Sequence, residues 1–347
     1  MLHHSLRSSM HKKFKWYEPA RAKSYDKFLN FILGGRGIGK TYGFKKDAIK
    51  RFKTKGEQFF YIKRHKTDMQ NIDTFLNDMI ENFPKDKFKI SAGKKFTRFY
   101  INGLEMGYAM PLSLYANLKS SSFNKVTTII FDEFLPEKGG YNMYIPNEVE
   151  IFLNMVDSIF RQRNGHVYLL ANKTSISSPY FSYFNITVNA NKEFNTFNFN
   201  ESVKQILIQN CGDDYSKGDG EKSRFQTLIQ GTRYGDYNSG EFAYDTNDFI
   251  AKKEKTARYF ATLYLDGFYY GVYIDTMLGK FYIDKDVNME YPYKYAIGNN
   301  RCENMILAKE WRKDYKLSAI VRNFRAGNIW FSNAQVKTDM TYILSKF

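Results

Sequence analysis

A glycine-rich stretch is the first part of this sequence whose residue types suggest chemistry. Residues 34–41, GGRGIGKT, match the pattern GxxxxGK[ST]. Glycines let backbone N–H groups turn toward a phosphate, and the N-terminal end of a following helix adds positive charge. The expected phosphate-binding residues are Gly34, Gly35, Arg36, Gly37, Ile38, Gly39, Lys40 and Thr41. Lys40 is expected to reach the β- and γ-phosphates, and Thr41 to place its hydroxyl on Mg²⁺.

A second motif supplies the carboxylates that such a site requires. The stretch TTIIFDE has β-branched and apolar residues followed by Asp132 and Glu133. A carboxylate at the end of a buried strand can hold Mg²⁺, which assigns this role to Asp132. Glu133 is then placed to polarise a water for attack on the γ-phosphate. The plain alternative is a strand that ends in two solvated acids, and the presence of both motifs in order argues against it.

The residues around these motifs indicate which class of nucleotide hydrolase is present. The guanine-reading motif NKxD is absent, because Ser175 stands where its Asp would be. The pattern favours ATPases with an additional strand between the two motifs and a glutamate on the second. In that class Asn172 is the natural polar sensor of the γ-phosphate, although an ordinary strand-end turn residue explains it equally well. Arg36, inside the loop, either contacts phosphate or a partner subunit, or is simply solvated.

Two arginines follow an amphipathic segment between the second motif and Asn172. Apolar residues at 149, 152, 153, 156, 159 and 160 fall on one face of a helix that ends near Arg161 and Arg163. Cations at this position can simply complement the helix dipole. They can also act as an arginine finger on the ATP of a neighbouring subunit, which would require a ring.

The elements that must position these residues alternate between strand and helix. Strands are expected at 25–33, 57–64, 126–134 and 166–172, and helices at 42–52, 73–83 and after Pro146. Asn102-Gly103 between alternating runs predicts a hairpin. This order predicts an α/β fold, a P-loop ATPase domain of the additional-strand (ASCE) class with a parallel central sheet.

The amino-acid composition of the sequence changes after residue 205. We expect the ATPase domain at 1–205, a polar, glycine-rich linker at 206–240 and a small α+β domain at 241–347. Within the last part, residues 258–284 predict three short antiparallel strands and residues 304–325 predict a helix.

The amino-acid composition indicates which kinds of binding partner suit this protein. The 347 residues carry 52 Lys plus Arg against 36 Asp plus Glu, a net charge of +16, which favours a polyanion such as nucleic acid. A solvated basic surface is the alternative. The two cysteines lack CxxC spacing, which argues against a zinc site, and no apolar run is long enough for a membrane span.

As a set, these motifs resemble the DNA-packaging ATPases of phi29-like tailed bacteriophages. The resemblance rests on GGRGIGKTY, GEQFFYIKR, VTTIIFDEF, YIPNEV, DSIFRQR and LLAN followed by SSPYF, and it covers residues 15–190 best. It implies a homopentameric ring on the portal of a prohead, in the host cytoplasm, that hydrolyses ATP to drive double-stranded DNA into the capsid. Some such motors also use a packaging RNA.

Carried over by position, the resemblance assigns further roles. Arg161 corresponds to the finger that acts in trans, and Lys66 to a second basic residue that acts across the interface. The C-terminal domain is expected to resemble a vestigial RNase H-like nuclease that binds nucleic acid by charge. Asp266, Asp275 and Asp284 are the acids that an active nuclease would need to gather.

Two other functions stay open at this point. A large terminase with an active nuclease would need three or more carboxylates at one metal site. A P-loop ATPase switch that is not a motor would form no ring and would not respond to DNA. The basic, serine-rich residues 117–125 are either a DNA-gripping loop or a solvated connector.

Overall fold

A computed structural model gives the fold of two compact units. The residues that it describes are 16–118, 121–136, 144–145, 147–173, 178–184, 186, 188–189, 192–198, 204–212, 224–230, 232, 249–265, 268–297, 304–308 and 311–344. The first unit comprises residues 1–175 and 188–244, and the second comprises residues 176–187 and 245–347. Asp266, most of the expected linker and two residues of the 117–125 loop lie outside the described residues.

The first unit is built on a nine-stranded sheet in the order β3-β4-β5-β2-β6-β7-β1-β9-β8. Its strands are β1 (Leu29–Gly34), β2 (Gln58–Lys63), β3 (Phe88–Ala92), β4 (Thr97–Ile101), β5 (Leu104–Pro111), β6 (Val126–Asp132), β7 (His166–Asn172), β8 (Phe194–Asn198) and β9 (Lys204–Asn210). The strands from β5 to β9 in this order are parallel. The expected parallel central sheet is therefore confirmed, and β7 is the additional strand between β1 and β6.

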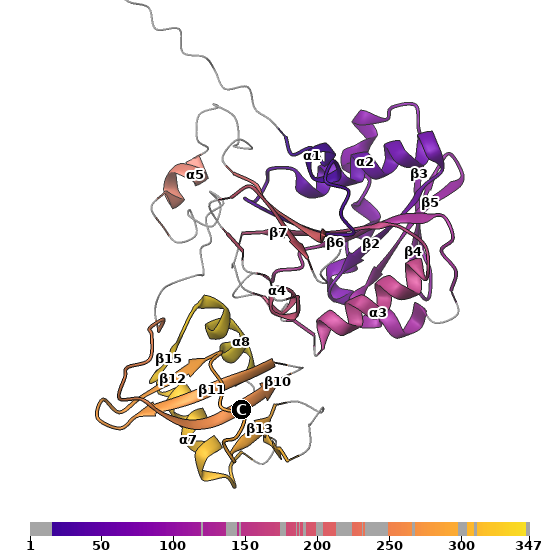
Figure 1. The fold of residues 1–347 in the computed structure, drawn as a ribbon. Coiled ribbons are helices and arrows are strands. Elements are labelled where there is room, and N and C mark those ends of the chain that lie inside the picture. The colour runs from indigo at the N-terminus through magenta and orange to yellow at the C-terminus, as the bar shows by residue number, and fades with distance from the viewer. Residues whose placement is uncertain are drawn as a thin grey trace, which may run out of the picture. The chain divides into compact units, whose positions relative to one another are not determined.

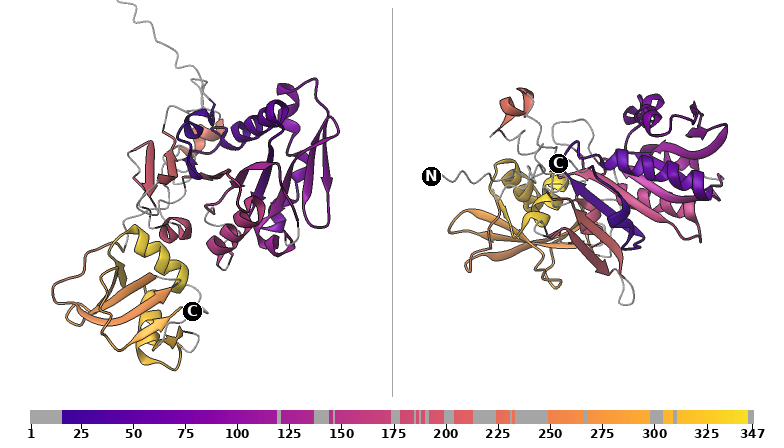
Figure 2. Two further views of the ribbon diagram at one scale, coloured as in Figure 1. Left: turned by 45° about the vertical axis from the view of Figure 1, so that its right-hand side comes forward. Right: turned by 90° about the horizontal axis from the view of Figure 1, so that it is seen from above.

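Helices cover both faces of this sheet (Figure 1). They are α1 (Ala20–Lys23), α2 (Lys40–Lys55) and α3 (Glu148–Phe160), and the unit also contains α5 (Arg224–Ile229). α2 and α3 lie on opposite faces, as the right-handed connection of parallel strands requires (Figures 1 and 2). α3 buries the apolar stripe predicted from its sequence, including Phe152, Val156 and Ile159. α2 ends at Gly56, whose φ of 70° stops the helix.

Three sequence expectations for this unit need correction. Residues 73–83 form no α-helix but short 3-10 turns, η2 (Ile72–Thr74) and η3 (Asn77–Asn82). A 3-10 turn, η1 (Lys66–Met69), comes before them, and another, η4 (Leu112–Leu118), precedes β6. The linker does not begin at 206, because β9 continues to Asn210 and pairs with β1. Burial of Ile206, Leu207 and Ile208 holds β9 in the sheet. Residues 176–187 group with the second unit.

The second unit has a six-stranded sheet in the order β14-β13-β10-β11-β12-β15. Its strands are β10 (Arg258–Leu265), β11 (Phe268–Asp275), β12 (Lys280–Asp284), β13 (Lys294–Ala296), β14 (Ile306–Leu307) and β15 (Ile329–Phe331). The expected antiparallel meander at 258–284 is present as β10, β11 and β12. Its helices are α4 (Pro179–Tyr183), α7 (Tyr315–Arg325) and α8 (Ala334–Leu344).

The core of the second unit explains its boundaries. Leu317 and Ile320 of α7 and Val336 and Met340 of α8 are fully buried in one cluster with the sheet. The helix expected at 304–325 begins only at Tyr315, because the Asp314 side chain accepts a hydrogen bond from the Leu317 N–H and caps it. α4 contacts α8, which is why residues 176–187 belong here.

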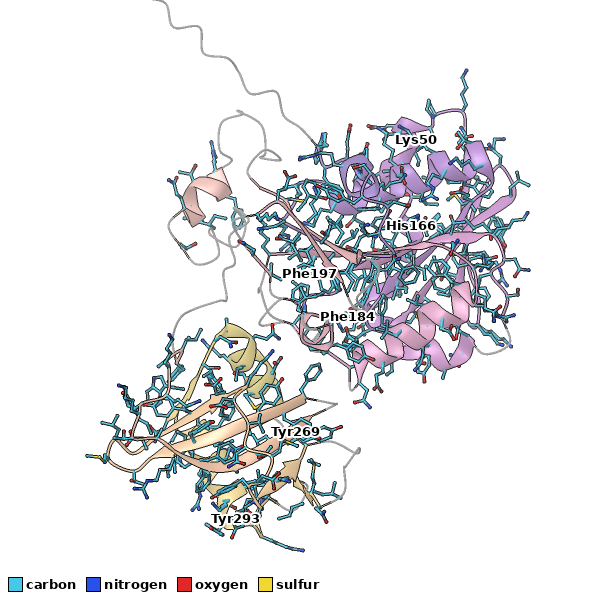
Figure 3. The ribbon with its side chains drawn as sticks, in the orientation of Figure 1. Lys50, His166, Phe184, Phe197, Tyr269 and Tyr293 are labelled. Atoms are coloured by element: carbon cyan, nitrogen blue, oxygen red, sulfur yellow. The ribbon has the colours of Figure 1, made fainter. Side chains whose placement is uncertain are left out.

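Aromatic side chains fill both units (Figure 3). Tyr269 of β11 packs against Tyr264 of β10, with ring centroids 4.9 Å apart and the ring planes inclined at 45°. Among the described residues, no helix has the length and apolarity needed to cross a membrane.

The expected hairpin is the turn between β4 and β5, where Asn102 has φ 50° and Gly103 has φ 82°. Both central residues therefore adopt the left-handed conformation of a type I′ turn. We expect Gly103→Ala to lower the free energy of unfolding by about 1 kcal/mol, because a Cβ is disfavoured at this φ. Urea unfolding measures the effect. Gly212→Ala, at a glycine with open space around it, is the control; an equal loss in both variants would contradict the turn assignment.

Candidate functional site

The glycine-rich loop connects β1 to α2, and two of its glycines adopt the left-handed conformation. Gly37 has φ 78° and Gly39 has φ 89°, values that L-residues with a Cβ adopt rarely. The N-terminal segment braces the loop, because the Tyr17 N–H donates to the Ile38 carbonyl at 2.9 Å. Lys40 is the first residue of α2, so the N-terminal end of that helix opens onto the space above the loop.

Lys40 lies folded into this loop. Its Nζ donates to the carbonyls of Gly34 and Gly35 at 3.0 and 2.8 Å and to Asn172 Oδ1 at 3.2 Å. Burial lowers the pKa of the ammonium from its usual value to about 8, although the nearby Asp132 opposes this. A buried cation that is held only by neutral carbonyl and amide oxygens is ready to take an anionic ligand.

Asp132 is held at the end of β6 by groups from two other elements. Its Oδ1 accepts from Thr41 Oγ1 at 3.0 Å, and its Oδ2 accepts from the Tyr61 hydroxyl at 2.7 Å. Burial alone would raise the pKa of this carboxyl, but the Lys63 ammonium and these hydrogen bonds outweigh it and hold the pKa below its usual range. The site therefore places an ionised carboxylate beside a hydroxyl, two hard oxygen ligands that suit Mg²⁺.

Glu133 is the next residue after Asp132, but its side chain is exposed to solvent whereas that of Asp132 is buried. Its side chain is 56% exposed, and its backbone has φ 59°, an uncommon value for a residue with a Cβ. The Lys63 ammonium lies 3.0 Å from Glu133 Oε2 and 3.3 Å from Asp132 Oδ2, so it bridges the two acids. Burial disfavours the charged form of Lys63, but the two carboxylates outweigh it and raise its pKa.

Arg64, the next residue of the chain, holds the backbone of the same segment. Its Nη1 donates to the Glu133 carbonyl at 3.0 Å, and its Nη2 donates to the Phe134 carbonyl. Its Nε donates to Glu148 Oε2 at 2.9 Å in an ion pair whose side chains are 3% and 1% exposed. The Glu148 carboxylate also accepts from the Ile145 N–H, at the entrance of α3. These bonds fix Glu133 in its unusual conformation.

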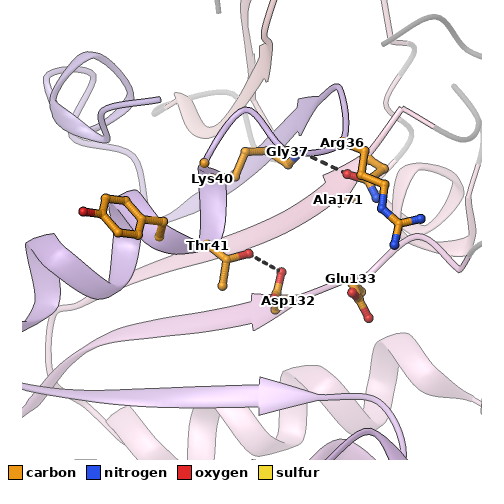
Figure 4. Close-up of a pocket in the computed structure, with 10 residues that line it drawn as sticks. Arg36, Gly37, Lys40, Thr41, Asp132, Glu133 and Ala171 are labelled. Atoms are coloured by element: carbon orange, nitrogen blue, oxygen red, sulfur yellow. Dashed lines mark hydrogen bonds between the residues drawn. The ribbon is translucent and has the colours of Figure 1, made fainter. Parts of the chain in front are cut away.

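The loop and the two acids line one pocket of about 250 Å³ (Figure 4). Its lining residues are Arg36, Gly37, Gly39, Lys40, Thr41, Tyr42, Asp132, Glu133, Ala171 and Asn172. The structure thus brings together the loop, both acids and Asn172, as the carboxyl ends of neighbouring parallel strands require. The Arg36 guanidinium points toward the side of the pocket where Glu133 lies (Figure 4).

Arg161 and Arg163 lie near the amino-terminal end of β6, opposite the strand ends that carry the two acids. Arg163 donates to the carbonyls of Phe123, Asn124, Val126 and Ile159, at 2.7 to 3.0 Å. Val126 begins β6 and Asp132 ends it, so about 20 Å of strand separates the two arginines from the acids. Arg161 is exposed and donates to the Ser121 carbonyl at 3.3 Å. Neither arginine lines the pocket of its own chain.

The remaining sequence candidates are dispersed. Lys66 is exposed just beyond β2. In the second unit, Asp275 accepts hydrogen bonds from the Thr256 hydroxyl and the N–H groups of Met277 and Leu278, and Asp284 pairs with Lys253 at 3.2 Å. No group of three potential metal ligands occurs among the described residues, and Asp266 lies outside them.

Sequence reasoning missed Tyr61, Lys63, Arg64 and Glu148. A signal was present: the apolar strand QFFYIKR ends in two cations, as the strand of Asp132 ends in two acids. Because β2 and β6 are adjacent and parallel, the two ends meet, and the cations face the acids.

The buried pair generates a prediction about stability. We expect Glu148→Gln to lower the free energy of unfolding by about 3 kcal/mol, because it leaves the Arg64 charge buried without its counter-charge. Chemical denaturation provides the measurement. Glu105→Gln, in an exposed pair with Arg98 at 3.0 Å, should cost less than about 1 kcal/mol. Similar losses in the two variants would show that the buried pair has no special role.

Comparisons with known proteins show the family to which this chain is similar. The chain matches the family model of the podovirus DNA encapsidation protein (Gp16) over residues 10–347. It is 38% identical over 318 residues to the DNA packaging protein of Bacillus phage B103, covering 91% of this chain and 96% of the relative. It is 36% identical over 335 residues to that of Bacillus phage phi29, covering 96% and 97%.

A solved structure extends the comparison to the fold. A chain of the bacteriophage phi29 viral genome packaging motor assembly matches with a TM-score of 0.71 and 34% identity, over 95% of this chain and 98% of that chain. The family model and the relatives each cover nearly the whole sequence. The chain therefore belongs to the podovirus DNA encapsidation protein (Gp16) family.

Proposed function

We propose that this protein is an ATPase that drives double-stranded viral DNA into a preformed capsid. The observation that carries the proposal is the pocket itself, in which Lys40, Thr41, Asp132 and Glu133 converge. The relatives are DNA packaging proteins that cover nearly the whole chain. The net charge of +16 also suits duplex DNA, which carries one negative charge per about 1.7 Å of its axis.

The chain's own residues divide the work on the nucleotide. The loop N–H groups bind the phosphates, and Lys40 leaves its carbonyl partners for the β- and γ-phosphates. The Thr41 hydroxyl and the Asp132 carboxylate, 3.0 Å apart, would hold Mg²⁺, which supplies charge neutralisation on the phosphate oxygens when bound. Asn172, bonded to Lys40 at the end of β7, is then adjacent to the γ-phosphate as a sensor, and Arg36 approaches from the loop.

Glu133 acts as the base that orients and deprotonates the attacking water. Its exposed carboxylate is paired with Lys63, which also contacts Asp132. Because the ion pair holds this carboxylate 3.0 Å from Lys63, we expect the side chain to turn away from Lys63 in order to orient a water at the γ-phosphate. The Arg64 bonds keep the backbone in place during such a turn.

Arg161 acts on the ATP of a neighbouring subunit. It is exposed, and its position about 20 Å from the acids of its own chain prevents it from reaching its own γ-phosphate. An arginine that offsets transition-state charge in trans requires a closed ring, for which we propose a homopentamer on the portal of a prohead in the host cytoplasm. Lys66 is a weaker trans candidate, whereas the carbonyl contacts of Arg163 favour a structural role.

The second unit is proposed to be an RNase H-like domain without nuclease activity. The order β14-β13-β10-β11-β12, with an antiparallel meander and two parallel strands beside β10, supports this fold. A two-metal nuclease needs carboxylates that meet at ions about 4 Å apart. Asp275 and Asp284 instead bind a turn and a lysine, so the active-nuclease alternative is not favoured. The unit is proposed to bind DNA, or a packaging RNA, by charge.

The base assignment and the motor function can be tested together. We expect duplex DNA to stimulate ATP hydrolysis by the full-length chain, and Glu133→Gln to bind ATP but lose at least about 100-fold of the rate, because no base remains. Steady-state turnover with and without DNA, combined with ATP-binding measurements, provides the readout. Turnover by Glu133→Gln at the normal rate would refute the base; a DNA-independent rate would favour an ATPase switch that is not a motor.

The trans arrangement has its own test. Arg161→Ala alone should lose about 1000-fold of the rate, because the transition-state charge is not offset. Mixing Arg161→Ala with Glu133→Gln subunits creates interfaces with an intact Glu133 on one side and an intact Arg161 on the other. We expect activity to return at these interfaces, with each variant alone as the control. Absence of any recovery in rings shown by mass to be mixed would contradict action in trans.

A further inference from the structure

A half-exposed tryptophan lies beside the phosphate-binding loop, and no role described above uses it. Trp16 is 52% exposed, although large aromatic side chains are usually buried. Its ring packs on Gly39 so closely that a Cβ on that glycine would come within 2.7 Å of Trp16 Cε3. The next residue, Tyr17, fixes the segment through its backbone bond to Ile38 and through its hydroxyl, which donates to Gln209 at 2.9 Å. Trp16 is therefore adjacent to the loop because the fold holds it there.

A second aromatic residue adjoins this tryptophan from the first turn of α2. The rings of Trp16 and Tyr42 have centroids 6.1 Å apart. Asn82 Nδ2 donates to the Tyr42 hydroxyl at 2.6 Å, which orients the tyrosine, and Tyr42 lines the pocket. Trp16 therefore packs against two residues that line the pocket, Gly39 and Tyr42.

The positions of the catalytic side chains indicate which way a bound nucleotide would lie in the pocket. The γ-phosphate must lie where Lys40, Asp132 and Glu133 meet, because hydrolysis occurs there. The α-phosphate and the nucleoside then leave the loop on the side away from the acids. Gly39 and Tyr42 flank Lys40 and Thr41 in the chain and are not needed for the γ-phosphate, and Trp16 adjoins both.

We propose that Trp16 and Tyr42 form the stacking site for the base of a purine nucleoside triphosphate. The inference rests on the proposed ATP site and specifies how that site recognises the nucleoside. Stacking on an aromatic ring does not require hydrogen bonds to a base edge, and purines present the larger surface. Trp16 contributes the main face, and Tyr42 limits the position of the base from the side of α2.

The test separates the base from the phosphates in the full-length protein. Trp16→Ala should raise the KM for ATP about tenfold or more and leave kcat unchanged, because stacking acts on the ground state and the transition state alike. The inhibition constant of inorganic tripolyphosphate, which has no base, should not change. Trp16→Phe should restore most of the affinity for ATP.

Matched variants keep the test decisive. Tyr25→Ala removes a partly exposed ring that stacks on Phe194 at 4.8 Å and does not adjoin the pocket, and it should leave the KM unaltered. If Trp16→Ala fails to fold, Trp16→Leu still covers Gly39 without a π face and should show the same loss.

The possible outcomes distinguish the inference from the function on which it rests. An unchanged KM for ATP, or an equal loss of tripolyphosphate affinity, would overturn the stacking site, the latter because it indicates loop distortion. A wild-type protein that neither hydrolyses ATP nor binds tripolyphosphate would instead overturn the proposed function.

Discussion

The buried guanidinium of Arg64 is the constraint on which the geometry of the site depends. It joins the end of β2 to the carbonyls after β6 and to Glu148 at the start of α3. Charges buried this deeply are tolerated only when their hydrogen bonds are satisfied, so the three segments cannot separate without a large cost. The left-handed backbone of Glu133 is a consequence of this connection, and so is the direction in which α3 leaves the sheet.

Two adjacent residues at the end of β2, Lys63 and Arg64, contact the segment of the two acids in different ways. Lys63 contacts the carboxylates, whereas Arg64 contacts the backbone that carries one of them. Asp132 is buried and has neutral donors as well as the ammonium, but Glu133 is exposed and its carboxylate pairs with the ammonium. The Lys63 ammonium therefore pairs with a buried carboxylate at Asp132 and with an exposed one at Glu133, an asymmetry that suits the metal-ligand and base roles proposed for the two acids.

The two ends of the parallel strands carry different parts of the proposed ATPase site. The carboxyl ends of β1, β6 and β7 collect the loop, the acids and Asn172. The connection from α3 to β7 places Arg161 at the other end of the strands, because a crossover helix runs antiparallel to the strands that it joins. In the proposed ring, Arg161 at one end of the strands of one subunit could approach the phosphate site at the other end of the strands of its neighbour.

The sequence by itself determined the local parts of this protein: the loop conformation, the strands that end in Asp132 and Asn172, the hairpin at Asn102 and the apolar face of α3. Each depends on residues close together in the chain, so glycine positions and periodicity suffice to predict it. Only the tertiary structure decided which side chains meet. Tyr61 and Asp132 are 71 positions apart and Arg64 and Glu148 are 84 apart, so no local pattern contains either pair. Packing also turned the helix expected at 73–83 into 3-10 turns, extended the sheet by β8 and β9, and moved residues 176–187 into the second unit, because burial against distant segments outweighs local propensity.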